Sequence, residues 1–145
     1  MLAESIGQLE RFVRLLEDEH EMLLATRVEA LLALAEDKTA AVRQLQQSEN
    51  ARAMLLGRAG IDARHGKVTS FIETLPDAGR KAWARYLELA ATAQAMNQRN
   101  GTFIRDQLRA SQQAMAILLA NSGPNLYDAS GMSSARPSGR LFGRA

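Results

Sequence analysis

The fold class is decided by residues 77–121, which read DAGRKAWARYLELAATAQAMNQRNGTFIRDQLRASQQAMAILLAN. This stretch contains no proline, and its apolar and small residues recur at alternating steps of four and three. That spacing is the a/d pattern of a helix packed against partner helices over several heptads. We therefore predict one continuous helix from Asp77 to about Asn121, longer than a compact globular helix needs. Its predicted seam consists of Trp83, Leu87, Ala90, Gln94, Asn97, Gly101, Ile104, Leu108, Ser111, Met115 and Leu118.

Two further helices are predicted upstream. The same alternation runs from Leu2 to Leu23, so the first helix is expected to cover about residues 3–25. A new apolar register starts at Leu31 and continues to Leu55. Thr26 and Glu29 have the spacing of a capping box, which favours a turn near Thr26 over one long kinked helix.

Lys38 lies on the seam of this second helix. A buried lysine needs a charged partner, so we expect either an ion pair with an acid such as Glu17 or Glu19, or a side chain that extends to solvent.

The remaining segments complete the predicted fold. Glycines at 57, 60 and 66 interrupt the helical pattern, and residues 68–75 predict a short helix or turn before Pro76. After Ser122 the composition changes to glycine, serine, proline and spaced arginines, which is typical of disorder. We predict an all-α fold, an elongated antiparallel helical bundle or coiled coil of three long helices plus a short connecting helix. The predicted division is a helical domain at residues 1–123 and a flexible docking tail at 124–145.

No residues in the pattern expected of a catalytic or metal site are present. The chain has no cysteine, and its two histidines, His20 and His65, lie in different predicted elements. There is no Ser/His/Asp arrangement, no phosphate-binding loop and no metal-ligand spacing. We therefore predict no enzyme activity, no catalytic residue, no cofactor and no metal.

Charge and hydropathy limit the kind of partner. Residues 1–60 carry seven bases and ten acids, whereas residues 61–121 carry eight bases and five acids. Because these halves are complementary, the basic residues are expected to match the acidic front half rather than nucleic acid. The early acid Glu4 argues against a secretory signal, and the longest apolar run, 114–120, is too short to span a bilayer. We expect a cytoplasmic protein without an integral membrane segment.

Two features point to a binding protein. The apolar face between Ile104 and Leu119 is broader than one seam, so it could accept an amphipathic partner helix. Leu126 and Tyr127 follow the predicted helix end and precede the tail, so they either dock onto a partner or fold back on the bundle. A self-associating structural bundle that uses the same face is the alternative.

The sequence around residues 97–131 resembles the FlgN family of flagellar type III export chaperones. The family signature Asn-x-x-Asn-Gly is similar to Asn97, Asn100 and Gly101, and a later Gln-Gln-Ala stretch corresponds to residues 112–114. A Leu-Tyr-x-x-x-Gly element is matched at residues 126–131, although Asp128 departs from the usual Leu-Tyr-Gly form.

This resemblance implies a function and a set of partners. It implies a cytoplasmic chaperone that holds the hook–filament junction proteins FlgK and FlgL through their C-terminal helical segments before export. We expect these clients to contact Ile104, Leu108, Met115 and Leu118. The resemblance further implies that Tyr127, beside Leu126, engages the export-gate protein FlhA. For Asn97, Asn100 and Gly101 we favour a structural role in fixing helix register over client contact.

Overall fold

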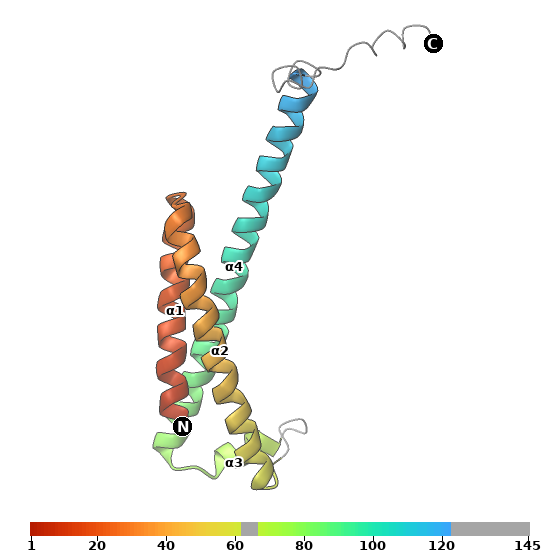
Figure 1. Ribbon diagram of the computed structural model, residues 1–145. Helices are drawn as coiled ribbons and strands as arrows, with labels where there is room; N and C mark the ends of the chain where they lie inside the picture. Colours follow the sequence, from red (N-terminus) through yellow and green to blue (C-terminus); the bar gives the residue numbers. More distant parts are fainter. Residues whose placement is uncertain (62–66, 123–145) are drawn as a thin grey trace, which may run out of the picture. The chain divides into compact units, whose positions relative to one another are not determined.

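The computed structural model describes residues 1–61 and 67–122, and within these ranges every regular element is an α-helix. Figure 1 shows α1 (Leu2–Leu24), α2 (Val28–Arg58), α3 (Lys67–Glu73) and α4 (Asp77–Ser122). The predicted fold class, three long helices and a short connecting one, is confirmed. The predicted tail at 124–145 lies outside the described residues, so the boundary at 123–124 stays a prediction.

The chain forms two compact units, residues 1–103 and residues 104–145. The first unit contains α1, α2, α3 and α4 up to Phe103, and the helical bundle is formed within it. The described part of the second unit is the last segment of α4, residues 104–122.

α1 and α2 are joined by a tight turn whose geometry differs from the predicted capping box. The amide of Thr26 donates to the Leu23 oxygen at 3.2 Å, and that of Arg27 donates to the Met22 oxygen at 3.0 Å. These are the two bonds of a Schellman motif, in which Thr26, at φ 56°, takes the left-handed position usually held by glycine. Thr26 therefore ends α1. The capping-box prediction is wrong, because α2 begins at Val28 with no side-chain cap.

The second helix follows its predicted seam. Leu34 is buried, and Leu31, Lys38, Leu45 and Ser48 are half-buried. Leu55, the last predicted member of the seam, departs from it and is 49% exposed. α2 ends at Arg58 with a second left-handed residue, Gly60, at φ 76°. Glycine has no Cβ, so this position carries no steric strain.

α4 starts directly after Pro76. Asp77 is its first helical residue, as predicted, and the Pro76 oxygen accepts the Arg80 amide at 3.0 Å. The Asp77 carboxylate lies in the first turn, 2.9 Å from Lys81 Nζ. An acid in that position interacts favourably with the helix dipole.

The core of the first unit is formed chiefly by α1 and α4. Its buried members are Leu9, Phe12, Leu16, Tyr86, Leu89 and Ala93. Leu16 is 0% exposed, and burying a leucine of this kind contributes roughly 1.5–3 kcal/mol. Ala41 and Leu45 of α2 pack against this cluster from the side.

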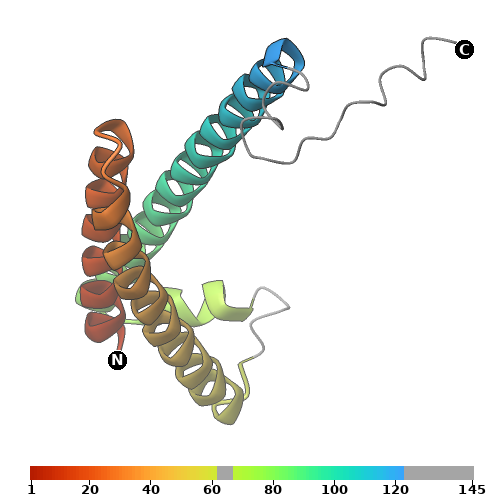
Figure 2. The same cartoon turned by 45° about the horizontal axis from the view of Figure 1, so that its top comes forward.

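Contacts across the bundle define its directions. Early residues of α1 meet early residues of α4, since Glu10 lies 3.5 Å from Arg85, and Glu19 lies 2.9 Å from Asn100. These two helices are therefore parallel. α2 runs antiparallel to both, as Figures 1 and 2 show.

The seam of α4 lies one residue earlier than predicted. Leu87 was placed on it but is 50% exposed, whereas Tyr86, Leu89, Ala93 and Asn100 are buried. The prediction followed the spacing of apolar and small residues, and it missed Tyr86 and Asn100, whose hydroxyl and side-chain nitrogen donate to Glu49 of α2 and to Leu16 of α1. The buried Oδ1 atom of Asn100 has no hydrogen-bond partner among the described residues. Two other predicted members, Trp83 and Ala90, do pack against the core.

Candidate functional site

The described end of α4 carries an apolar stripe on an otherwise solvent-exposed helix. We use the name client stripe for Ile104, Leu108, Met115 and Leu118, which are 44%, 57%, 56% and 59% exposed. At 100° per residue these four lie within about 80° of one another around the helix. Every residue from 104 to 121 is classed as exposed. The stripe is thus an apolar, solvent-exposed face of α4.

The second half of the stripe lies in an uncharged segment, whereas Arg105, Asp106 and Arg109 flank its first half. Residues 110–122 contain no Asp, Glu, Lys or Arg. An uncharged, apolar and exposed helix face is a feature of interaction surfaces rather than of ordinary solvated helices. An isolated helix of this length would be marginal in water, but this one extends a helix already nucleated in the bundle.

Two further apolar residues were not assigned to the site. Leu119 is 41% exposed and by helical periodicity lies on the stripe side, so it extends the stripe. Ile117 is 61% exposed but points roughly 100° away from Leu118, to the other side of the helix. The i, i+4 and i+7 spacing could have identified Leu119 from the sequence.

Asn100 lies at a junction of three helices. Its side-chain Nδ2 donates to the Leu16 main-chain oxygen and to Glu19 Oε1, each at 2.9 Å. Lys38 Nζ of α2 donates to both carboxylate oxygens of Glu19 at 3.1 Å. We call Glu19, Lys38 and Asn100 the register cluster, because it joins α1, α2 and α4 at one level. Of the two alternatives for Lys38, the ion pair with Glu19 is present.

The register cluster is largely removed from water. Asn100 is 0% exposed and Glu19 is 7% exposed. A buried carboxylate needs donors on its remaining lone pairs, and here an ammonium and an amide supply them. Of the other two signature residues, Asn97 is exposed and Gly101 is half-buried, and their roles remain predictions.

A second polar cluster was missed by sequence reasoning. The Tyr86 hydroxyl donates to Glu49, and Arg52 donates to both Glu49 and the Tyr86 hydroxyl. The Arg52 guanidinium lies 4.3 Å from the centre of the Tyr86 ring, which stacks on Trp83. Burial, followed by the hydrogen bond to Glu49, raises the pKa of Tyr86 above 10.0 against the opposing effect of Arg52. Arg52 falls on the four-and-three spacing that runs from Leu31 to Leu55, and a base at such a position was the available signal for this cluster.

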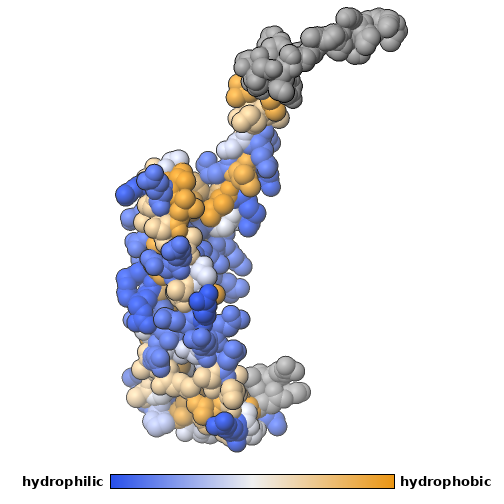
Figure 3. Space-filling model, viewed as in Figure 1, coloured by the Kyte–Doolittle hydropathy of each residue, from blue (hydrophilic) through white to orange (hydrophobic). Residues whose placement is uncertain are grey.

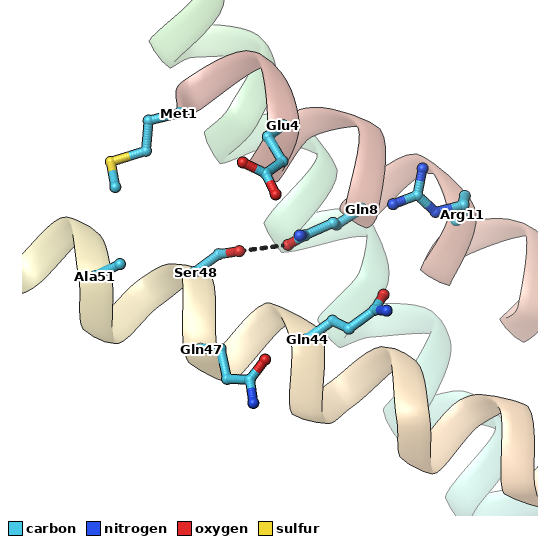
Figure 4. Close-up of a pocket in the computed structure, with 8 residues that line it drawn as sticks. All are labelled: Met1, Glu4, Gln8, Arg11, Gln44, Gln47, Ser48 and Ala51. Carbon is cyan, nitrogen blue, oxygen red and sulfur yellow. Dashed lines mark hydrogen bonds between the residues drawn. The ribbon is translucent and has the colours of Figure 1, made fainter.

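The described residues also form hollows elsewhere. A polar hollow of about 430 Å³ lies between α1 and α2, and there the Ser48 hydroxyl donates to Gln8 at 2.8 Å. Figure 4 shows the residues that line it. An apolar one of about 290 Å³ lies where α2, α3 and the start of α4 meet, and Phe71, Ile72 and Leu75 line it.

Other predicted features are placed as follows. Leu126 and Tyr127 lie outside the described residues. Within residues 1–61 and 67–122, no three acidic or histidine side chains gather where they could hold a metal ion. No helix in the same ranges is long and apolar enough to cross a membrane.

As a class, this is an all-α bundle protein whose longest helix presents an exposed apolar stripe. A sequence model described as "FlgN protein" matches residues 1–135. The Flagella synthesis protein FlgN of Yersinia enterocolitica is 24% identical over 132 residues, covering 90% of this chain and 84% of that protein. The chain belongs to the FlgN family. No solved structure matched it.

Membership of this family indicates the cellular process in which the chain takes part. The chain is a flagellar protein that takes part in flagellum biogenesis, and a role in chaperoning and export is consistent with the family.

Proposed function

We propose that this chain is a cytoplasmic export chaperone whose client stripe binds the C-terminal helical segments of FlgK and FlgL. The observation that carries the proposal is the stripe itself: four apolar side chains, 44–59% exposed, on one face of a helix in a flagellar protein. An amphipathic client helix would bury its own apolar face against them, with anchors spaced by helical turns.

The dimensions of the stripe suit such a client. From Ile104 to Leu118 it spans fourteen residue steps, roughly 21 Å, which corresponds to about four turns of a partner helix. The stripe includes Met115, whose unbranched side chain adapts to differently shaped partners. That adaptability fits a surface that receives two clients.

The client complex would then be delivered to the export gate. In this proposal Tyr127, with Leu126 beside it, docks onto FlhA. A tyrosine offers both an apolar ring and a hydroxyl while losing little side-chain entropy, which suits it to anchor a short segment. The division between a helical chaperone domain at 1–123 and a docking tail at 124–145 belongs to the same proposal.

Co-purification tests the client. The full chain, co-expressed with FlgK of the same organism, is expected to elute with it as one stable complex in size-exclusion chromatography. FlgK truncated before its C-terminal helical segment is expected to elute separately. Equal recovery of intact and truncated FlgK would contradict the proposal.

Self-association through the same stripe is the competing function. An exposed apolar stripe is also what a helical oligomer would use. Sedimentation velocity of the purified chain at several concentrations separates the two. The chaperone is expected to sediment mainly as a monomer that shifts on adding client, whereas a structural bundle protein would form a fixed oligomer that ignores the client.

A further inference from the structure

A second exposed apolar surface lies in the first unit, at the turn between α1 and α2. We define the tip patch as Leu24, Val28 and Leu32, which are 62%, 60% and 67% exposed. Leu32 is the most exposed large apolar side chain among the described residues. Figure 3 shows hydrophobic surface at this end of the α1–α2 pair.

The tip patch does not serve the bundle. The packing face of α2 is given by Leu31, Leu34 and Lys38, and Leu32 lies to the side of it. Leu24 and Val28 are at helix ends, beyond the core cluster. Apolar side chains that contribute no packing and remain largely exposed indicate an interaction surface.

The patch is surrounded by negative charge. Between Arg14 and Lys38 the sequence has seven acids and a single base, Arg27. Of these acids only Glu19 is buried. The acids that lie a helical turn from the patch are Glu21, Glu29 and Glu36, all exposed. No ion pair links any of these three to another residue within 1–61 or 67–122.

A hollow beside the patch adds a place for a cation. It measures about 220 Å³ and is lined by Asp18, Glu21, Met22, Ala25 and Arg27. Asp18 and Glu21 are three positions apart in the sequence, so their carboxylates lie on one face of α1. An arginine or lysine of a partner could place its charged end between them, while its neighbours contact the apolar side chains.

We propose that the tip patch is a docking surface for a basic amphipathic helix of another protein, separate from the client stripe. Charge complementarity selects this occupant: unpaired carboxylates around leucine and valine attract cationic residues that flank an apolar face. The same carboxylates repel nucleic acid and anionic lipid. The surface lies in the first unit and remains if the client assignment fails.

The test uses the full chain and a synthetic probe. The probe is a helix of roughly 18 residues, or five turns, with leucines along one side and arginines on its flanks. A matched peptide has glutamate in place of every arginine. We expect the basic peptide to shift amide resonances of residues 18–36 in nitrogen–proton correlation spectra. We expect the acidic peptide to shift none of them.

Variants identify the contacts by fluorescence anisotropy of the labelled peptide. Two tip variants should each raise Kd roughly tenfold. One is the double variant Asp18→Asn with Glu21→Gln, and the other is Leu32→Ser. Glu73→Gln, an exposed acid on α3, and Leu118→Ser, on the client stripe, should leave Kd unchanged. Binding should also weaken at about 1 M salt, where the Debye length is roughly 3 Å.

Several results would overturn the proposal. One is retention of binding by both tip variants, and another is movement of the shifted resonances to residues 104–118. If the acidic peptide bound as tightly as the basic peptide, the exposed carboxylates would not select the partner. If the chain alone dimerised and Leu32→Ser abolished the dimer, the occupant would be a second copy and the proposal would be wrong. Melting curves for the tip variants exclude loss of fold, which is not expected because Asp18, Glu21 and Leu32 are exposed.

Discussion

The side-chain amide of Asn100 in α4 donates to the main-chain oxygen of Leu16 in α1 at 2.9 Å, across 84 residues of sequence. The same amide contacts Glu19, which also holds Lys38 of α2. Glu19 of α1 therefore contacts both α2 and α4, just before α4 enters the second unit. A role of Asn100 in fixing helix register stays a prediction, and these contacts support it.

Replacement of Asn100 by alanine should destabilise the bundle. The change removes two hydrogen bonds to α1 and leaves the buried Glu19 with fewer donors, so we expect a loss of about 1–3 kcal/mol in the free energy of unfolding. Urea denaturation followed by circular dichroism measures this loss. Asn97→Ala is the matched control, because Asn97 is exposed, and it should change stability by less than about 0.5 kcal/mol. Equal effects of the two variants would contradict the structural distinction between them.

Thr26→Gly should stabilise the protein. Thr26 has φ 56°, and the left-handed conformation costs a residue with a Cβ roughly 1–2 kcal/mol. Glycine removes that strain but adds freedom to the unfolded chain, so the net gain expected is about 1 kcal/mol. Thermal unfolding measures the gain. The control Thr26→Ala retains the Cβ and should give no comparable increase in stability. A lower melting temperature for Thr26→Gly would contradict the claim that Thr26 is strained.

The stability of the chain at alkaline pH should depend on Tyr86. Burial raises the pKa of this hydroxyl above 10.0, so the unfolded chain loses the proton at a lower pH than the folded chain. The stabilising contribution is therefore complete below pH 10 and is lost as pH rises through the higher folded pKa. The measurement is the free energy of unfolding between about pH 9 and 11 for wild type and Tyr86→Phe. The difference between the two should shrink with rising pH, and a constant difference would contradict the assignment.

Tyr127→Ala should separate client binding from gate docking. We expect this variant to keep the helical melting transition and the FlgK complex, but to lose binding to FlhA and to impair filament assembly in cells. All three measurements are needed on one preparation. If client binding falls together with gate binding, Tyr127 belongs to the client site instead.

Helical spacing was enough to predict where the three long helical stretches lie, but it did not decide whether the first two form one kinked helix or whether residues 68–75 form a helix or a turn. Repeats of four and three residues set the predicted helix at 77–121, and the structure has α4 at Asp77–Ser122. The pattern also identified the α2 seam, because Leu31, Leu34 and Leu45 are apolar and regularly spaced.

What spacing could not predict was the packing of polar side chains. Tyr86 and Asn100 are buried, and Glu49, Arg52, Leu16 and Glu19 lie within hydrogen-bond distance of them in the fold. Such partners are distant in sequence, so the α4 seam was predicted one residue late. The role of Thr26 in the turn was also predicted wrongly. A threonine just before a helix usually caps that helix, and only the backbone hydrogen bonds show that Thr26 ends α1 in a Schellman motif instead.

The central claim is that the client stripe binds the FlgK terminal helix, and titration calorimetry of three proteins with a peptide of that segment tests it most directly. Leu118→Asp places a charge on the stripe and should weaken binding roughly thirtyfold, about 2 kcal/mol. Ile117→Asp introduces the same charge one residue earlier, on the other side of α4. Its Kd for the peptide should stay within about threefold of the wild-type Kd. Circular dichroism should show equal helical content in all three. Wild-type affinity in Leu118→Asp, or equal losses in both variants, would contradict the claim.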